Sequence, residues 1–289
     1  MLLAQPHLID SILIDLGLLD KDGKTHGAKT KDTPALSTKI LGPDFDGDPF
    51  DQPWDYRSVV GKLNFLEKST RLDITYAVHQ CSRFMASPKK SHGEAVKHIG
   101  RYLLATRGKG MIIKPDPSQQ FECWVDADFT GNWDQNIALE DSDTARSRYG
   151  FVVKYAGFPL YWASKMAGQI ALSTTESEYI GLSMATRYVK GTVYLMEELK
   201  KRGFQVHVQP KMLCTIFEDN QAALEMARRP KIRPRTRHLN VMLHHFHAEV
   251  LDGTLLPVSC DTTKQQADIL TKPVDLATLL RHRLSLLGW

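Results

Sequence analysis

The sequence is poor in cysteine, and it lacks the cysteine spacings that hold metals. Its 289 residues include four cysteines, and no two of them form a C-x-x-C pair. Three lie in apolar runs, where a free cysteine behaves as a small hydrophobic residue. We therefore expect no disulfides, no cysteine-based zinc site and a reducing compartment. The four are Cys81, Cys123, Cys214 and Cys260.

Long apolar runs and a secretory signal are also missing. The first nineteen residues are apolar, but Asp10 and Asp15 interrupt them and no basic region precedes them. No run approaches the length of a transmembrane helix. We expect an intracellular protein without a membrane partner. The stretch is predicted to form an amphipathic helix from about Pro6, and we expect the sequence to begin partway through a larger architecture.

Charge of one sign is not dominant either. The net charge is +4, 24% of the residues are charged and 42% are hydrophobic, which is typical of soluble globular proteins. The length suits two domains of ordinary size, or one domain with a large appendage. Net charge therefore says little about a polyanionic partner, and the distribution of charge is more informative.

The first part of the chain is predicted to be helical. Residues 20–53 are polar and turn-rich, which indicates a loop or linker. Asp55 can cap a helix whose apolar residues recur at helical spacing. Further helices are predicted over 74–85 and from about Ser91 until Gly108. These segments form a small helical unit.

The pattern changes to an α/β order after residue 110. Apolar runs of strand type lie at 121–125, 149–155, 160–163, 212–217 and 255–260. Helices are predicted over 174–201, 220–228 and 238–251, and a final one from about Lys264. This order predicts a mixed five-stranded sheet with flanking helices, preceded by the helical unit.

Four acidic residues stand where apolar elements end or begin. Asp126 directly follows the first strand-type run, and Glu178 lies early in the long predicted helix. Asp219 follows the fourth strand, and Asp268 opens the last helix. In α/β sheets functional groups gather at such positions, and two divalent ions held by shared carboxylates suit phosphodiester hydrolysis. Two competitors remain open, because Asp128 and Glu176 lie two residues from Asp126 and Glu178.

The motifs around these acids resemble a known family. VDADFTG, ALSTTESEYIGL, FEDNQAAL and QQADILTKP are similar to the four blocks of the ribonuclease H domain of copia-type retrotransposon Pol polyproteins. DYRSVVGKLNFLEKSTRLDITYAVHQCSRFM and RYLLATRGKGM resemble the segment that joins reverse transcriptase to that domain. Leu72 stands where the joining segment usually has proline. The resemblance covers nearly the whole chain from about residue 55.

The resemblance implies a fold, a cofactor and a substrate. The fold would be ribonuclease H-like, with residues 1–54 as helix and linker, 55–112 as the joining segment and 115–289 as the nuclease. The cofactor would be two Mg²⁺ ions, which Mn²⁺ could replace, with no small-molecule cofactor. The substrate would be the RNA strand of an RNA–DNA hybrid. Metal-binding and catalytic carboxylates map onto Asp126, Glu178, Asp219 and Asp268.

The resemblance also defines a missing part and favours one of the competing glutamates. Glu178, followed by Tyr179, matches the helical glutamate of the family, so Glu176 is interpreted as a first-turn acid near a cap at Ser173 or Thr174. The polymerase palm of the reverse transcriptase is not in this sequence. We expect no polymerase activity from it, and we expect the absent reverse transcriptase portion to be a partner.

A basic run follows the third acid. It contains two prolines and no acidic residue, which predicts an extended loop that binds nucleic-acid phosphates; a merely solvated loop is the alternative. Its basic residues are Arg228, Arg229, Lys231, Arg233, Arg235 and Arg237.

Two functions of different classes remain open. The first is a metal-dependent endonuclease of the ribonuclease H type, which the four acids favour. The second is a non-catalytic remnant of a truncated polyprotein that binds nucleic acid or only packs against the reverse transcriptase. Fold alone cannot separate them, because one fold hosts many functions.

Overall fold

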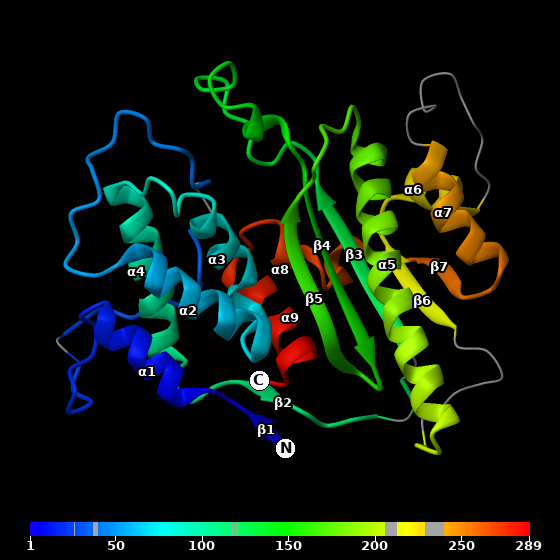
Figure 1. Cartoon of the computed structure of the whole chain (residues 1–289), viewed down its shortest axis with the longest axis horizontal. Coiled ribbons are helices and arrows are strands. Elements are labelled where there is room, and N and C mark those ends of the chain that lie inside the picture. The colour runs from blue at the N-terminus through cyan, green and yellow to red at the C-terminus, as the bar shows by residue number, and fades with distance from the viewer. Residues whose placement is uncertain (26, 37–39, 117, 120, 206–212, 229–239) are drawn as a thin grey trace. The chain divides into compact units, whose positions relative to one another are not determined.

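The computed structural model describes residues 1–25, 27–36, 40–116, 118–119, 121–205, 213–228 and 240–289. These residues form two compact units (Figure 1). Unit 1 contains Met1–Ile113 and Lys272–Trp289, and unit 2 contains Lys114–Thr271.

Unit 2 is built on a five-stranded mixed sheet with the order β5-β4-β3-β6-β7. Strands β3, β4 and β5 are antiparallel neighbours, and β3, β6 and β7 are parallel neighbours. The strands are β3 (Phe121–Asp128), β4 (Arg148–Tyr155), β5 (Phe158–Met166), β6 (Cys214–Glu218) and β7 (Leu255–Ser259).

The long helix α5 (Thr174–Lys201) covers one face of this sheet, as Figure 1 shows. Alternate residues of the strands point to this face, and they form the core of unit 2 with the apolar side of α5. Gly181 brings the helix close to β3, because a Cβ at this position would lie 3.2 Å from Val125 Cγ1. The side chains of Cys123, Val125, Phe151, Ile216 and Leu182 belong to this core.

Shorter helices complete unit 2. Helices α6 (Gln221–Arg228) and α7 (Asn240–Leu251) pack against α5 and β7. The helix α8 (Asp268–Thr271) packs against β3, β4 and β5. Single 3₁₀ turns are η2 (Ser142–Ala145) and η4 (Thr262–Lys264).

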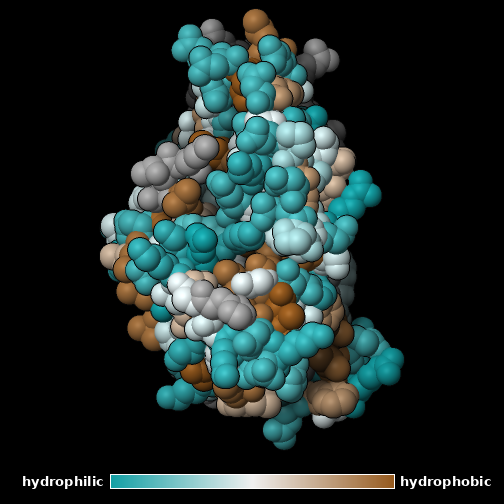
Figure 2. All heavy atoms as spheres, turned by 90° about the vertical axis from the view of Figure 1, so that its left-hand side faces the viewer, coloured by the Kyte–Doolittle hydropathy of each residue, from teal (hydrophilic) through white to brown (hydrophobic). Residues whose placement is uncertain are grey.

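Unit 1 is mainly helical. Its elements are β1 (Leu2–Leu3), α1 (Pro6–Asp15), α2 (Tyr56–Ser69), η1 (Leu72–Ile74), α3 (Thr75–Ser82), α4 (Lys90–Ala105), β2 (Met111–Ile112) and α9 (Leu276–Leu287). Asp55 caps α2 by accepting a 2.6 Å hydrogen bond from the backbone N–H of Ser58. Figure 2 shows a largely hydrophilic face with small apolar areas between the polar groups.

A buried ion pair lies in the core of unit 1. Arg71 donates two hydrogen bonds to Asp73, at 2.9 and 2.8 Å, and Tyr102 donates a third at 2.6 Å. Both charged side chains are fully buried. Leu72, at the position where the resembling segment usually has proline, is also fully buried.

The predicted fold class is confirmed: a mixed five-stranded sheet with flanking helices, preceded by helices. The prediction of a single final helix from about Lys264 is wrong. The chain forms η4, α8 and α9 instead, because Pro273 disfavours helical geometry at Lys272. The predicted domain boundaries at 54/55 and 112/115 stay predictions, but the structure groups 272–289 with unit 1. No helix among the described residues is long and apolar enough to span a membrane.

Candidate metal centre

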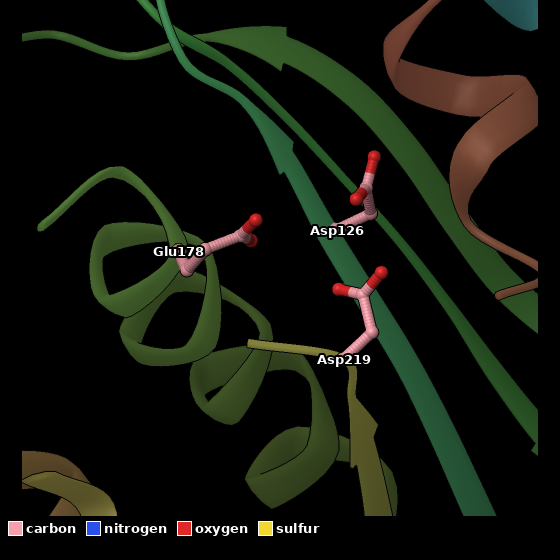
Figure 3. Close-up of side chains that lie close together, drawn as sticks. All are labelled: Asp126, Glu178 and Asp219. Atoms are coloured by element: carbon pink, nitrogen blue, oxygen red, sulfur yellow. The ribbon is translucent and has the colours of Figure 1, made fainter. Parts of the chain in front are cut away.

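Three carboxylates from three elements of unit 2 converge on one point. Asp126 lies on β3, Glu178 on α5, and Asp219 directly after β6. One oxygen from each lies within 4.8 Å of the others, and Figure 3 shows Glu178 reaching from its helix toward the two aspartates. We call Asp126, Glu178 and Asp219 the acidic cluster. Among the residues that the structure describes, these three are the potential metal ligands whose oxygens lie this close to one another.

The register of the sheet creates the space for this cluster. β3 pairs with β6 only as far as Trp124 and Phe217, while it pairs with β4 up to Asp128. On the β6 side, the last part of β3 is therefore free of a neighbouring strand within the described chain. Side chains contact this unpaired edge of β3 instead. The carboxylate of Glu178 accepts a hydrogen bond from the backbone N–H of Ala127, and the side-chain amide of Gln265 donates a 2.7 Å hydrogen bond to the carbonyl of Val125.

Asp126 lies inside β3, and the expectation that it ends the strand is wrong. It stands opposite Gly150 of β4, and this antiparallel ladder extends β3 to Asp128. Thr271 of α8 donates a short hydrogen bond from its hydroxyl to Asp126 Oδ2. Gly150 permits this approach, because a Cβ there would lie 2.7 Å from the Cβ of Leu270. The Asp126 carboxylate is thus held in place by α8.

Glu178 lies in the second turn of α5 and is 5% exposed. The helix begins where it does because Ser173 caps it, accepting a 3.2 Å hydrogen bond from the N–H of Glu176. Glu178 Oε2 is buried and has no hydrogen-bond partner. Burial, and after it the charge of Glu218, raise the pKa of Glu178 well above its usual value, and the two aspartates of the acidic cluster add to the effect.

The two competing acids occupy other positions. Glu176 Oε2 accepts a 3.0 Å hydrogen bond from the backbone N–H of Leu172, so this side chain stabilises the start of α5. The carboxylate of Asp128 lies over the following turn, where a Cβ at Gly131 would meet its Oδ2 at 1.6 Å. Neither belongs to the acidic cluster. This placement supports Asp126 and Glu178, whose roles remain predictions.

The fourth predicted acid lies beside the acidic cluster and not within it. Asp268 begins α8 and is 7% exposed. Burial raises the pKa of the Cys260 thiol to about 12, and the charges of Asp219, Glu218, Asp268 and Asp126 contribute to this shift. Thr271 of the same short helix donates a hydrogen bond to Asp126, so α8 brings Asp268 close to the acidic cluster.

Three residues that the sequence did not single out belong to this region. Glu218 is the last residue of β6 and is fully buried. Thr271 is 1% exposed and Gln265 is fully buried. For Glu218 a signal was available: the alternation Cys214, Ile216, Glu218 places a carboxylate on the buried face of the strand. For Thr271 and Gln265 the local sequence offers no such signal.

The comparisons with known proteins identify the family. The chain is 31% identical over 247 residues to the retrovirus-related Pol polyprotein from transposon RE1 of Arabidopsis thaliana, covering 86% of this chain. It is 34% identical over 220 residues to that from transposon TNT 1-94 of Nicotiana tabacum, covering 76% of this chain. The chain belongs to the retrovirus-related Pol polyproteins of transposons. The resemblance drawn from the four sequence blocks is thereby confirmed.

This Pol polyprotein chain spans a small part of its relatives. It covers 16% of the RE1 polyprotein and 15% of the TNT 1-94 polyprotein. No protein-family model matches it. A solved structure of LC11-RNase H1 in complex with an RNA/DNA hybrid aligns with 53% of this chain and 94% of that one, at 16% identity and a TM-score of 0.34.

The donor set of the acidic cluster fits a hard divalent cation. Carboxylate oxygens are the ligands that Mg²⁺ and Mn²⁺ take in proteins. Three buried or half-buried carboxylates this close repel one another, and the unpartnered Glu178 Oε2 has no donor to satisfy it. A bound cation would remove both penalties. The Pol polyprotein chain therefore has a site that suits a divalent ion.

Most of the predicted basic loop lies outside the described residues. This applies to Arg229, Lys231, Arg233, Arg235 and Arg237. Arg228 is described: it ends α6, is exposed, and donates a 2.9 Å hydrogen bond to the carbonyl of Pro257. Its predicted contact with nucleic acid remains a prediction.

Proposed function

We propose that this segment of a Pol polyprotein is a divalent-metal-dependent ribonuclease H, which hydrolyses the RNA strand of RNA–DNA hybrids during reverse transcription. The observation that carries the proposal is the convergence of the acidic cluster, with ligand oxygens from three elements within 4.8 Å of one another. The copia-type sequence blocks supply those same residues, and relatives named as Pol polyproteins match 86% and 76% of the chain.

The residues have distinct roles in this proposal. Asp126, Glu178 and Asp219 would hold the metal, and Asp268 would complete the set from the start of α8. The cofactor is two Mg²⁺ ions, with Mn²⁺ as a substitute, and when bound they activate water and stabilise charge on the phosphate. Thr271 holds Asp126 in orientation, and Ala127 does the same for Glu178.

Basic residues after α6 would bind the hybrid. Arg228 and the five basic residues that follow it carry positive charge close in sequence to Asp219. Lysine and arginine contacts to phosphates position a duplex without reading its sequence, and contacts to the 2′-hydroxyl groups distinguish RNA from DNA. The remaining partner in this proposal is the reverse transcriptase portion of the polyprotein.

The rival proposal is a non-catalytic remnant. The complete set of four acids favours the enzyme, because a remnant has no requirement to keep buried, mutually repelling carboxylates.

Hydrolysis of a hybrid whose RNA strand carries a 5′ label tests the proposal directly. The wild type is compared with Asp219→Asn, and with Glu225→Gln as a matched control on the exposed side of α6. In Mg²⁺ or Mn²⁺ the wild type and the control should cleave equally, while Asp219→Asn should be slower by about 100-fold or more, as for removal of other single catalytic groups. Equal rates in all three proteins, or cleavage that persists in EDTA, would refute the assignment.

A further inference from the structure

Glu218 presents a carboxyl group that the acidic cluster does not account for. It is the last residue of β6, directly before Asp219, and its side chain is fully buried. Glu218 Oε1 accepts a 3.0 Å hydrogen bond from the backbone N–H of Asn220. Glu218 Oε2 is buried and has no hydrogen-bond partner.

The direction of this side chain follows from the strand. Residues of β6 alternate, and Cys214 and Ile216 point into the core beneath α5. Glu218 has the same parity, so it points to the α5 face at the end of the strand where Glu178 lies.

A buried carboxylate oxygen without a hydrogen-bond partner is costly. Unpaired buried charges destabilise a fold by several kcal/mol, so such groups are paired with cations, bind metals or stay neutral. Among the described residues no lysine, arginine or histidine forms an ion pair with Glu218 or Glu178. Glutamate at this position destabilises the unliganded protein where an apolar residue would continue the core.

We propose that Glu218 is a further carboxylate of the metal centre, whose Oε2 faces the divalent ion bound by the acidic cluster from the buried side of the sheet. This inference rests on the metal binding in the proposed function, not on hydrolysis. It assigns two consecutive acids to one site. Asp219 approaches from beyond the end of β6, and Glu218 approaches from within the core.

The variant Glu218→Gln isolates the relevant atom. Glutamine has nearly the same volume and keeps an oxygen that accepts from Asn220, and it replaces the unpartnered oxygen with an amide nitrogen. Glu225→Gln removes the same charge from an exposed position on α6 and serves as the matched control. Asp219→Asn serves as the reference for a lost metal ligand.

Two readouts on the full chain test the inference without measuring activity. Mn²⁺ affinity is measured by the loss of the free-ion electron paramagnetic resonance signal, and thermal stability is measured in EDTA and in Mn²⁺. We expect Glu218→Gln to bind Mn²⁺ about 10-fold or more weakly, while its melting temperature in EDTA stays equal to that of wild type or rises. The control should match the wild type in both readouts.

The outcomes separate the two proposals. Unchanged Mn²⁺ affinity in Glu218→Gln, with weakened binding in Asp219→Asn, overturns the role of Glu218 and leaves the metal centre standing. A wild type that binds no Mn²⁺ overturns both. A lower melting temperature in EDTA for Glu218→Gln shows a structural role and overturns the inference. If that variant does not fold, Glu218→Asp, which keeps the charge but withdraws it by one methylene group, must bind Mn²⁺ more weakly, and wild-type affinity refutes the role.

Discussion

Unit 1 and unit 2 each contain a cluster of buried charged residues, and the two clusters are built in opposite ways. Unit 1 encloses Arg71 and Asp73 at 2.8 Å, and Tyr102 donates a further hydrogen bond to the same carboxylate. Burial opposes ionisation of Asp73, but the Arg71 guanidinium lowers its pKa below the usual value. Unit 2 instead gathers carboxylates of one sign, and the pKa of Glu178 is raised. The first arrangement is electrostatically complete, and the second is balanced only when a cation binds.

This difference shows how a structural charge can be told from a functional one. A buried ion pair is satisfied by its own fold and needs nothing from solution. A buried cluster of like charges lowers the stability of the unliganded protein, and such strain is typical of sites that bind a ligand. The comparison therefore predicts opposite signs for charge-removing substitutions in the Arg71–Asp73 pair and in the acidic cluster.

The largest effect is expected at Arg71. The substitution Arg71→Met leaves Asp73 buried and unpaired, so the free energy of unfolding should fall by about 3–5 kcal/mol. Urea denaturation followed by tryptophan fluorescence measures the loss. Lys90→Met, which removes an exposed ion pair to Asp48 in the same unit, should change it by less than about 1 kcal/mol. A similar small change at Arg71 would contradict the comparison.

The next effect is expected at the contact between α8 and β3. Thr271→Val keeps the shape of the side chain and removes the hydroxyl that donates to Asp126. Loss of a hydrogen bond to a buried charged group should destabilise the protein by about 2 kcal/mol, measured by urea denaturation in EDTA. Thr271→Ser keeps the hydroxyl donor, so its free energy of unfolding should fall by less. Equal losses in both variants would show that packing, and not the hydroxyl, holds α8.

A pH-dependent effect of about 1–2 kcal/mol is expected from His282 in α9. Burial, with the charge of Arg281 next, lowers its pKa from 6.5 to about 4. The unfolded chain therefore binds more protons between these values, and stability should be fully present above pH 6.5 and fall as the pH drops toward 4. Urea midpoints at pH 7.5 and 5 measure this. His282→Gln should reduce the difference in unfolding free energy between pH 7.5 and pH 5. An unchanged difference in this variant would refute the role of His282.

The smallest effect has the opposite sign. Glu178→Gln removes one charge from the acidic cluster and keeps an oxygen to accept from Ala127, so the unfolding free energy in EDTA should rise by about 1 kcal/mol. Added Mn²⁺ should stabilise the wild type more than this variant. Destabilisation in EDTA would mean that the carboxylates of unit 2 do not repel one another as the comparison requires.

Local signals predicted the positions that a single element defines. Ser173 and the apolar spacing after it predicted the start of α5, and Asp219 follows a strand as expected. The apolar run stops before Asp126, which predicts a strand end there, yet β4 supplies a partner that extends β3 to Asp128. This pairing depends on a distant segment, so the residues around Asp126 carry no signal that the strand continues past it.

The remaining differences have the same origin. Glu218 continues the alternation of Cys214 and Ile216, which predicts the buried face of the strand, but what covers it there depends on the placement of α5 above β6. The break between α8 and α9 was foreseeable from Pro273, but the assignment of the two helices to different units was not. Glu176 and Glu178 lie on one helix, and only the position of β3 separates a residue that stabilises the helix start from one that joins the acidic cluster.

Unit 1 is made of two separate stretches of chain, 1–113 and 272–289, and this has a consequence for the order of events during synthesis. The ribosome makes all of unit 2 before it makes Trp289, whose ring packs against the Arg283 guanidinium and whose indole N–H donates to the carbonyl of Gly110. Unit 2 is therefore complete in sequence while unit 1 still lacks α9. The helical unit, whose first residues are made before unit 2, can be completed only after all of unit 2 has been made.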